Sequence, residues 1–196
     1  MEKDLIILVV PFAYEALILL RRFFEIKRDF LDHHKNVLFV FVNDKADTSR
    51  DMIFFEVFGE NNPNAILLHN HKSNSIKAGA VYTGMAWALD NYPEAKKIGF
   101  VDMDDSIALE SAYEAMLQVE NFEAIPVLLS YRNQRAFLDG LASFGYSLFV
   151  KALFPIINKA KIKDLQNGFK CFSPDFLDSF YKNTVIVDLS FAFDMD

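Results

Sequence analysis

The chain has 196 residues, 52% of them apolar and 15% aromatic, which predicts one well-packed globular domain and excludes an intrinsically disordered segment. Its formal net charge is −7 and no basic block occurs, so no nucleic-acid partner is expected. A single cysteine, Cys171, excludes an internal disulfide framework and fits a reducing compartment, where a packed and inert thiol is expected.

Short apolar runs with the length of buried strands alternate with segments of helical spacing along the first hundred residues. The strands are predicted at 5–10, 37–42, 65–68 and 97–101, and the helices at about 14–30, 48–59 and 76–89. Strands continuously rich in Val, Ile and Phe that alternate with helices indicate a mostly parallel sheet covered on both faces.

The pattern becomes less regular in the second half of the chain. One more strand is predicted at 125–129 and a long amphipathic helix at 137–154, and the C-terminal part is predicted to mix short strands with turns. No repeat, low-complexity tract or linker divides the sequence. Residues 1–196 therefore read as one α/β domain.

No stretch comes near the roughly 18 consecutive apolar residues that a membrane-spanning helix needs. The first apolar run is short and is followed at once by Pro11, so it does not read as a signal peptide. Residues 145–157 fit a helix lying on a membrane as well as one facing the core. We expect a cytoplasmic protein, either soluble or peripheral at the cytoplasmic face of the membrane.

Acidic residues collect where the predicted parallel strands end, the edge at which open α/β sheets bind ligands. Glu15 follows the first strand, Asp44 the second, and Asp102, Asp104 and Asp105 the fourth. In an extended chain Asp102 and Asp104 face one side, and two converging carboxylates suit Mg²⁺ or Mn²⁺ bound together with a diphosphate. Alternatively, these acids are helix N-caps or solvated turn residues.

Other phosphate-binding patterns are missing from the sequence. It has no P-loop motif and no G-x-G-x-x-G after the first strand. A receiver domain needs its acidic pair after the first strand, where Pro11 stands. His69 and His71 lack an acidic third ligand at a spacing suited to zinc. A sugar-nucleotide site remains.

Five segments follow one another along the chain: VVPFAYEA, FVNDKADTS, NSIKAGAVYTG, VDMDD and IKDLQNGFKCF. They resemble, in the same order, motifs of the family 2 glycosyltransferases with the GT-A fold. The fifth is similar to I-x-D-x-Q-C-G-F-K-L-F of the polyprenyl-phosphate branch, which includes dolichol-phosphate mannose synthases and bactoprenol glucosyltransferases. The final FAFDMD resembles the F-x-F-D-V-E of this branch.

The resemblance implies a Rossmann-like, mostly parallel sheet flanked by helices, with an irregular C-terminal half for the acceptor. It also implies inverting transfer of a sugar from a UDP- or GDP-sugar to an acceptor, a polyprenyl phosphate, with a divalent metal on the diphosphate. The implied roles are as follows: Pro11, Glu15, Asp44, Lys77 and Asp102 at the nucleotide; Asp102 and Asp104 at the metal; Asp104 and Lys170 in catalysis; and Arg132, Arg135, Gln166 and Gly168 at the acceptor and its phosphate.

The chemistry of a phosphate acceptor agrees with this implication. A phosphate monoester is already ionised near pH 7, so its attack needs no general base. The protein then has to supply alignment and positive charge. The second half of the chain lacks the Glu-Asp base motif that relatives acting on sugar acceptors carry.

Several departures keep other interpretations open. Ile76, Ala78 and Tyr82 replace two glycines and an arginine of the third motif, and the chain stops at Asp196 inside the last one. We therefore expect a truncated domain, or a short form that works with a partner chain. The alternative function is a degenerate, non-catalytic sugar-nucleotide-binding or regulatory subunit. A third option is a nucleotidyltransferase. Such an enzyme needs a Gly-rich loop with an Arg after the first strand, and this sequence has no such loop there.

The proposed basic and glycine positions also have plainer explanations. Arg132 and Arg135 fit ordinary solvated charges, and Lys170 fits the exposed face of a strand. Gly168 fits a turn of any function.

Overall fold

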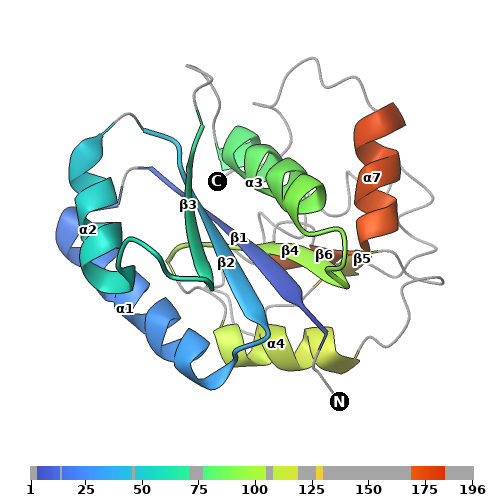
Figure 1. Cartoon of the computed structure of the whole chain (residues 1–196), viewed down its shortest axis with the longest axis horizontal. Helices are drawn as coiled ribbons and strands as arrows, with labels where there is room; N and C mark the ends of the chain where they lie inside the picture. Colours follow the sequence, from blue (N-terminus) through green and yellow to red (C-terminus); the bar gives the residue numbers. More distant parts are fainter. Residues whose placement is uncertain are drawn as a thin grey trace, which may run out of the picture.

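The computed structural model describes residues 4–13, 15–45, 47–70, 77–104, 108–118, 127–129 and 169–183. In this part of the chain, six strands form one sheet in the order β3-β2-β1-β4-β6-β5 (Figure 1). The strands are β1 (Ile6–Phe12), β2 (Val37–Asn43), β3 (Ala65–His69), β4 (Lys97–Val101), β5 (Val127–Leu129) and β6 (Phe169–Phe172). The first four are parallel, whereas β6 runs antiparallel to both β4 and β5.

Five helices accompany the sheet within the described residues, and the first three confirm the predicted alternation. They are α1 (Leu17–His33), α2 (Thr48–Phe58), α3 (Lys77–Asn91), α4 (Leu109–Gln118) and α7 (Pro174–Asn183). Helix α1 begins and ends three residues later than predicted, and its N-cap, Ala16, makes no side-chain capping bond. Without a capping side chain, the sequence carried no local signal for where the helix begins.

Both faces of the central strands are buried, as the continuous apolar runs predict. Every residue of β1, β2 and β4 is buried. Side chains alternate between two clusters, because successive residues of a strand point to opposite faces. The cluster with Leu8 and Phe39 contains residues of α1, α2 and α4 and is called here the α1-side core. The cluster with Val9 and Val40 contains residues of α3 and is called the α3-side core.

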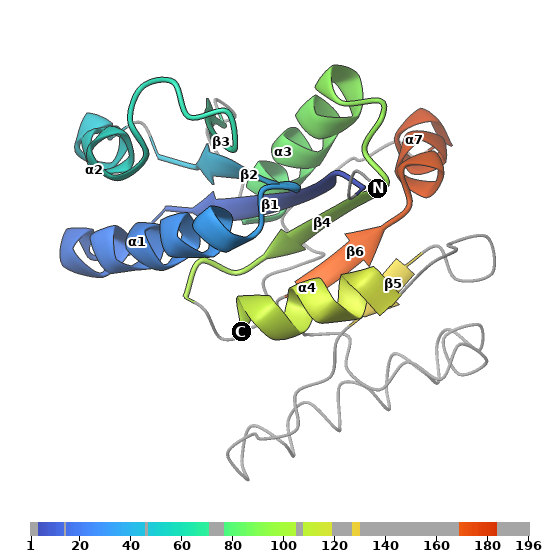
Figure 2. The ribbon, with the colours of Figure 1, turned by 60° about the horizontal axis from the view of Figure 1, so that its bottom comes forward.

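Figure 2 shows α3 and α7 on one side of the sheet and α1 and α4 on the other. Gly84 lets α3 approach the sheet closely: a Cβ atom there would meet Val9 Cγ1 at 2.5 Å and Val42 Cγ2 at 2.9 Å. This close packing holds the start of α3 next to the carboxyl edge of the sheet.

Pro11 lies inside a central strand, although the sequence placed the end of that strand before it. In β1 the backbone of Ile6 and of Phe12 bonds toward β2, whereas Leu5 bonds toward β4. Odd-numbered residues therefore face β4, and the pairing with β4 ends at Val9. Pro11 therefore faces β4 at a position beyond the last paired residue, where no hydrogen bond to β4 requires an N–H. The strand tolerates the proline for this reason.

The prediction of only short strands and turns in the C-terminal part is wrong for residues 174–183, which form α7. The backbone N–H of Phe176 donates to Ser173 Oγ at 3.2 Å, and Pro174 occupies the first helical position. Leu177 is 3% exposed and lies in the α3-side core. These are ordinary helix-start signals that the sequence interpretation overlooked. Helix α4 was likewise not predicted.

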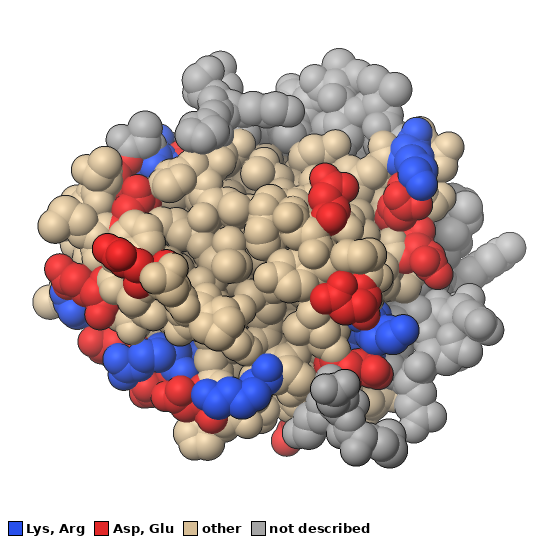
Figure 3. All heavy atoms as spheres, viewed as in Figure 1, with Lys and Arg blue, Asp and Glu red and all other residues tan. Residues whose placement is uncertain are grey.

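Some predictions lie outside the described residues: the start of the strand at 125, the helix at 137–154 and the FAFDMD segment. Within the described residues, no helix has the length and apolar character that crossing a membrane requires. On the face seen in Figure 3, Lys and Arg residues lie among Asp and Glu residues. Helix α1 makes two ion pairs, Arg21 with Glu56 of α2 and Arg28 with Asp29.

Candidate functional site

The carboxyl ends of β1 to β4 lie along one edge of the sheet, because these strands are parallel. Val42 and Phe100 belong to the α3-side core, so Asp44 and Asp102, two residues further on, project on that side. β1 separates β2 from β4, which places these two chain ends two strand spacings apart, about 10 Å. The edge therefore presents two carboxylates on the α3 side, on either side of the end of β1.

Asp102 makes an ion pair with Lys77, the first residue of α3. Lys77 Nζ lies 2.6 Å from Asp102 Oδ1, and their side chains are 31% and 16% exposed. Beyond Lys77, this buried oxygen has no hydrogen-bond partner among the described residues. Burial raises the pKa of the Asp102 carboxyl above its usual 3.8; attraction by Lys77 and Lys170 opposes this rise, and repulsion by Asp104 adds to it.

Lys170 approaches the same carboxylate from β6. Its backbone lies opposite Phe100 of β4, and its Nζ lies 5.0 Å from the centre of the Phe100 ring. Its charge also attracts the Asp102 carboxylate, and its role in the site stays a prediction. Gly99 permits this pairing, because a Cβ atom there would lie 2.6 Å from the Lys170 carbonyl oxygen.

Asp44 is held at the end of β2 by contacts with two other elements. Its backbone N–H donates to the Phe12 carbonyl at 2.9 Å, and its Oδ1 accepts a hydrogen bond from Asn70 Nδ2 at 2.7 Å. Asn70 is held in turn, since its N–H donates to the Asn43 carbonyl at 2.9 Å and its Oδ1 accepts from Thr83 Oγ1 of α3 at 3.4 Å. The Asp44 carboxylate is thereby fixed in orientation.

Glu15 and Pro11 lie at the end of β1. Glu15 Oε2 accepts a hydrogen bond from the Ala13 N–H at 2.8 Å, so this carboxylate braces the turn after the strand. Arg50 of α2 donates to the Glu15 carbonyl at 3.4 Å and pairs with Asp47. That Glu15 and Pro11 line a nucleoside pocket stays a prediction.

His69 takes part in a network on the α2 side of the edge. Its Nε2 lies 2.9 Å from Asp51 Oδ2, and Asp51 Oδ1 accepts a hydrogen bond from Asn43 Nδ2 at 3.0 Å. Asn43 is 1% exposed. His71 lies outside the described residues. The described residues contain no group of three or more His, Cys, Asp or Glu side chains that could hold a metal ion.

Asp104 is exposed, whereas Met103 beside it is 3% exposed and lies in the α1-side core. Met103 and Asp104 lie in a turn after β4, so that Asp102 and Asp104 converge on one metal ion stays a prediction. Mg²⁺ and similar hard ions are usually held by one or two carboxylates together with substrate phosphates. The two neighbouring carboxylates, with Lys77 and Lys170 beside them, fit an ion that is bound together with a diphosphate.

The structure thus brings Asp102, Lys77 and Lys170 together and fixes Asp44 on the same face of the edge. The predicted acceptor residues Arg132, Arg135, Gln166 and Gly168 lie outside the described residues.

Two residues with clear roles in the arrangement were not predicted. Asn70 follows β3 at the acidic edge, so its position after a predicted strand could have indicated it. Lys27 of α1 is fully buried between Phe24 and Leu31, and a lysine at a position where the helical period calls for an apolar residue is also a detectable signal.

Comparison with protein-family models finds no match, and comparison with curated proteins finds none either. Among solved structures, glucosyl-3-phosphoglycerate synthase from Mycobacterium tuberculosis, in complex with Mn²⁺, UDP and glucosyl-3-phosphoglycerate, is similar with a TM-score of 0.60 at 13% identity, over 90% of this chain and 59% of that chain. The same enzyme with Mn²⁺, UDP and phosphoglyceric acid gives a TM-score of 0.60 at 11% identity, over 92% and 65% of the two chains.

A mycobacterial protein matches with a TM-score of 0.61 at 15% identity, over 90% of this chain and 55% of that chain. The present chain therefore spans less than two thirds of the length of each of these structures. The likeness confirms the predicted fold, the mixed α/β GT-A arrangement of a mostly parallel sheet flanked by helices.

Proposed function

We propose that the chain binds a nucleotide-diphosphate sugar and a divalent cation at the carboxyl edge of its sheet and transfers the sugar to a phosphate-bearing acceptor. The observation that carries the proposal is the largely buried Asp102 carboxylate, which pairs with Lys77 and is also influenced by the charges of Asp104 and Lys170. Paired acids with adjacent cations suit a site that must hold a cation and a diphosphate together. The UDP and Mn²⁺ bound by the structural neighbour support this assignment.

Each residue of the edge has a definite task in the proposal. Asp44 accepts hydrogen bonds from the nucleoside, with its orientation held by Asn70. Asp102 contacts the nucleotide. Lys77, which pairs with Asp102 in the structure, turns its ammonium group to the diphosphate when the nucleotide binds. Asp104 holds Mg²⁺ or Mn²⁺, which supplies positive charge for the departing diphosphate. Lys170 supports the same negative charge.

The acceptor in the proposal is a polyprenyl phosphate, as the sequence resemblance implies. A phosphate oxygen forms a bond to the anomeric carbon while the bond from that carbon to the donor diphosphate breaks, and its electron pair leaves with the nucleotide. No proton has to be removed, and the configuration inverts. The structure of the neighbour contains phosphoglyceric acid, which also carries a phosphate. We therefore compare this smaller molecule with the lipid as an acceptor. A lipid acceptor requires peripheral contact with a membrane surface.

One observation favours the non-catalytic alternative. Tyr82 stands where the resembling family has an arginine, and its ring packs against Tyr181 of α7 with the ring centres 4.5 Å apart. Its carbonyl also accepts a hydrogen bond from the Tyr181 hydroxyl at 3.0 Å. Position 82 therefore serves packing between α3 and α7. A subunit that binds the nucleotide without transferring the sugar fits this replacement.

The test is a calorimetric titration of UDP and of GDP, with and without Mn²⁺, on the wild type and Asp104→Asn. We expect one nucleotide to bind more tightly with Mn²⁺, and this gain to be lost in Asp104→Asn. Asp90→Asn, an exposed acid near the other end of α3, is the matched control and should retain the gain. A folded wild type that binds neither nucleotide would contradict the proposal.

Transfer is then measured with the matching nucleotide sugars and two acceptors, a polyprenyl phosphate and 3-phosphoglycerate. Product from the lipid alone supports the full proposal. Product from phosphoglycerate alone overturns the lipid acceptor but retains the glycosyltransferase. Nucleotide binding without any product favours the non-catalytic alternative.

A further inference from the structure

Lys27 has no exposed surface. It belongs to α1, the helix that follows the carboxyl end of β1 and packs against one face of the sheet. The Lys27 Nζ donates a hydrogen bond to the Met103 carbonyl at 3.1 Å, across 76 residues of sequence. The ammonium group also lies 5.8 Å from the centre of the Phe23 ring. A fully buried lysine is rare, because taking its charge out of water is costly. The bond to the Met103 carbonyl is one interaction that compensates this cost.

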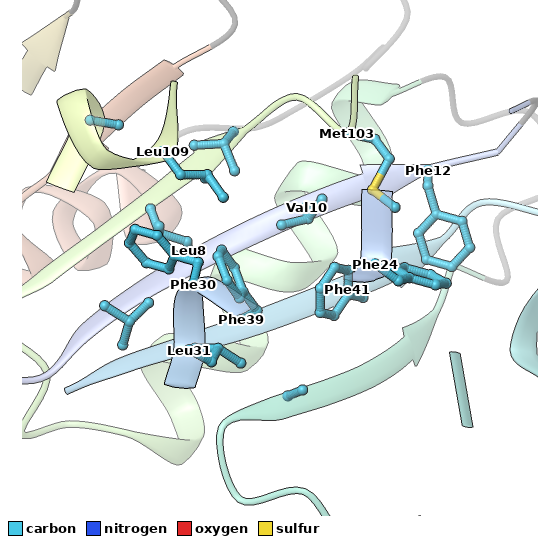
Figure 4. Packing of buried hydrophobic residues seen from close by; sticks show 14 of the residues in the cluster. Leu8, Val10, Phe12, Phe24, Phe30, Leu31, Phe39, Phe41, Met103 and Leu109 are labelled. Carbon is cyan, nitrogen blue, oxygen red and sulfur yellow. The ribbon is translucent and has the colours of Figure 1, made fainter. Parts of the chain in front are cut away.

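The residue that Lys27 holds is the middle of the Asp102–Asp104 segment. Met103 is anchored a second time by its side chain, which lies in the α1-side core with Phe12, Phe24 and Phe41 (Figure 4). The aromatic surroundings are tightly arranged, with ring centres 5.5 Å apart for Phe12 and Phe24 and 5.1 Å for Phe24 and Phe41. The segment is thus fixed from the α1 side, while Asp102 remains available on the α3 side.

The hydrogen bond to the Met103 carbonyl acts directly on Asp104. Because a peptide unit is planar, the direction of the Met103 carbonyl also sets the direction of the Asp104 N–H and the point from which the Asp104 side chain departs. A cation such as Mg²⁺ tolerates little deviation in ligand geometry, so a carboxylate on an unfixed turn is a poor ligand. A donor that stops the peptide unit from rotating keeps this ligand in place.

We propose that Lys27 is a positioning residue, which holds the Asp102–Asp104 turn in the geometry needed for joint binding of the divalent cation and the nucleotide diphosphate. This inference rests on the proposed function of the same edge. It adds a residue from α1 that contacts neither ligand and acts through the Met103 carbonyl.

A second lysine provides a matched comparison. Lys97, at the start of β4, is 7% exposed and donates a hydrogen bond to the Met116 carbonyl in the last turn of α4. It makes the same kind of buried bond to a main-chain carbonyl, but at the amino end of β4, away from the two acids. A loss that comes only from removing a buried lysine should therefore appear equally in Lys27→Met and Lys97→Met.

The test measures the dissociation constant of UDP with and without Mn²⁺ for the wild type, Lys27→Met, Lys27→Arg and Lys97→Met. Methionine retains most of the apolar stem while removing the donor and the charge. We expect Lys27→Met to reduce the Mn²⁺-dependent gain in affinity about 10- to 100-fold, as is typical for residues that orient metal ligands. The metal-free affinity should change less than about twofold, Lys27→Arg should restore part of the gain, and Lys97→Met should retain it. GDP replaces UDP if the wild type prefers it.

Circular dichroism and thermal unfolding show which variants are folded. If Lys27→Met does not fold, Lys27→Leu, which also removes the donor and the charge, carries the comparison with Lys97→Leu. A folded Lys27→Met or Lys27→Leu variant with the full Mn²⁺ gain overturns the inference, as does an equal loss in the matching Lys97 variant. A wild type that binds the nucleotide without any Mn²⁺ gain overturns the proposed metal site itself, and the inference with it.

Discussion

Lys77 Nζ lies 2.6 Å from Asp102 Oδ1, so the first residue of α3 neutralises a carboxylate at the end of β4. The pair joins two elements that the sequence connects only through the rest of α3 and the turn after it. Lys77, together with Lys170, compensates the negative charge of this largely buried acid. It also lies where a diphosphate would need positive charge, which links the resting arrangement to the proposed function.

Replacing Lys77 with Met should raise the pKa of Asp102 further, because the attraction that opposes the effect of burial is removed. The carbon-13 chemical shift of the Asp102 carboxyl, followed by NMR through an acid titration, measures this directly. Lys77→Arg retains the charge and should leave the midpoint nearer that of the wild type. The same Lys77→Met variant should bind UDP at neutral pH about tenfold more weakly, since a charged hydrogen bond contributes about 1.5–3 kcal/mol. An unchanged or lowered midpoint would contradict the ion pair.

Asp102→Asn should stabilise the protein near neutral pH. The folded pKa of Asp102 is raised above the unfolded value of 3.8, so the folded state holds this proton more tightly than the unfolded state does. That contribution to stability is complete below 3.8 and is lost as the pH rises through the folded pKa. Asparagine does not ionise, so its Tm should exceed that of the wild type near neutral pH, and the difference should close as the pH falls toward 3.8. Thermal unfolding at several pH values checks this; a lower Tm of the variant near neutral pH would mean that the Lys77 pair outweighs burial.

Asn70→Ala should weaken nucleotide binding without affecting its dependence on metal. Asn70 orients the Asp44 carboxylate through a 2.7 Å hydrogen bond, and both residues lie at the β2–β3 side of the edge. Loss of a partner that orients a ligand-binding side chain typically costs about 10- to 100-fold, so the metal-free affinity for the nucleotide should fall by about tenfold or more. Calorimetry with and without Mn²⁺ separates this effect from that of Lys27→Met. Equal losses of both quantities would argue against separate roles for Asn70 and Lys27.

Gly99→Ala should destabilise the pairing of β4 with β6. The added Cβ atom would lie 2.6 Å from the Lys170 carbonyl oxygen and 3.2 Å from Cys171 Cα, and both are backbone atoms that cannot rotate away. Overpacking of this kind costs about 1–3 kcal/mol, measured by urea unfolding. Lys96→Ala, an exposed change a few residues earlier, is the control and should stay within about 0.5 kcal/mol of the wild type. An unchanged unfolding free energy in Gly99→Ala would show that the backbone of β6 can shift away from β4 without cost.

Cys171 should make stability fall at alkaline pH. Burial raises the pKa of its thiol from 9.0 to about 12, although attraction by Lys97 opposes the rise. Between these values the thiol ionises only in the unfolded state, so stability decreases as the pH rises above 9.0, by about 1.4 kcal/mol per pH unit. The difference in unfolding free energy between the wild type and Cys171→Ala isolates this contribution from other groups that titrate there. A difference independent of pH would mean that the thiol is accessible to water in the folded protein.

The first half of the fold could be predicted because its signals are local. Runs such as residues 37–42 are apolar throughout, which happens when both faces of a strand are covered, and the four parallel strands follow from it. The acids Asp44 and Asp102 could be placed at one edge for the same reason. Helix α7 was missed although Ser173 and Pro174 mark its start, because these capping signals were overlooked in a segment predicted to hold short strands and turns.

The sequence by itself determined which residues form the first four strands and the first three helices, and that acids collect at the carboxyl edge, since both depend on periodicity and chain direction. It did not determine which charges meet. The bonds of Lys77 with Asp102, of Asn70 with Asp44 and of Lys27 with the Met103 carbonyl each join different elements. An ion pair or hydrogen bond exists only within about 4 Å, and the packing of helices on the sheet sets such distances. Tertiary structure alone therefore decided how this edge is held and charged.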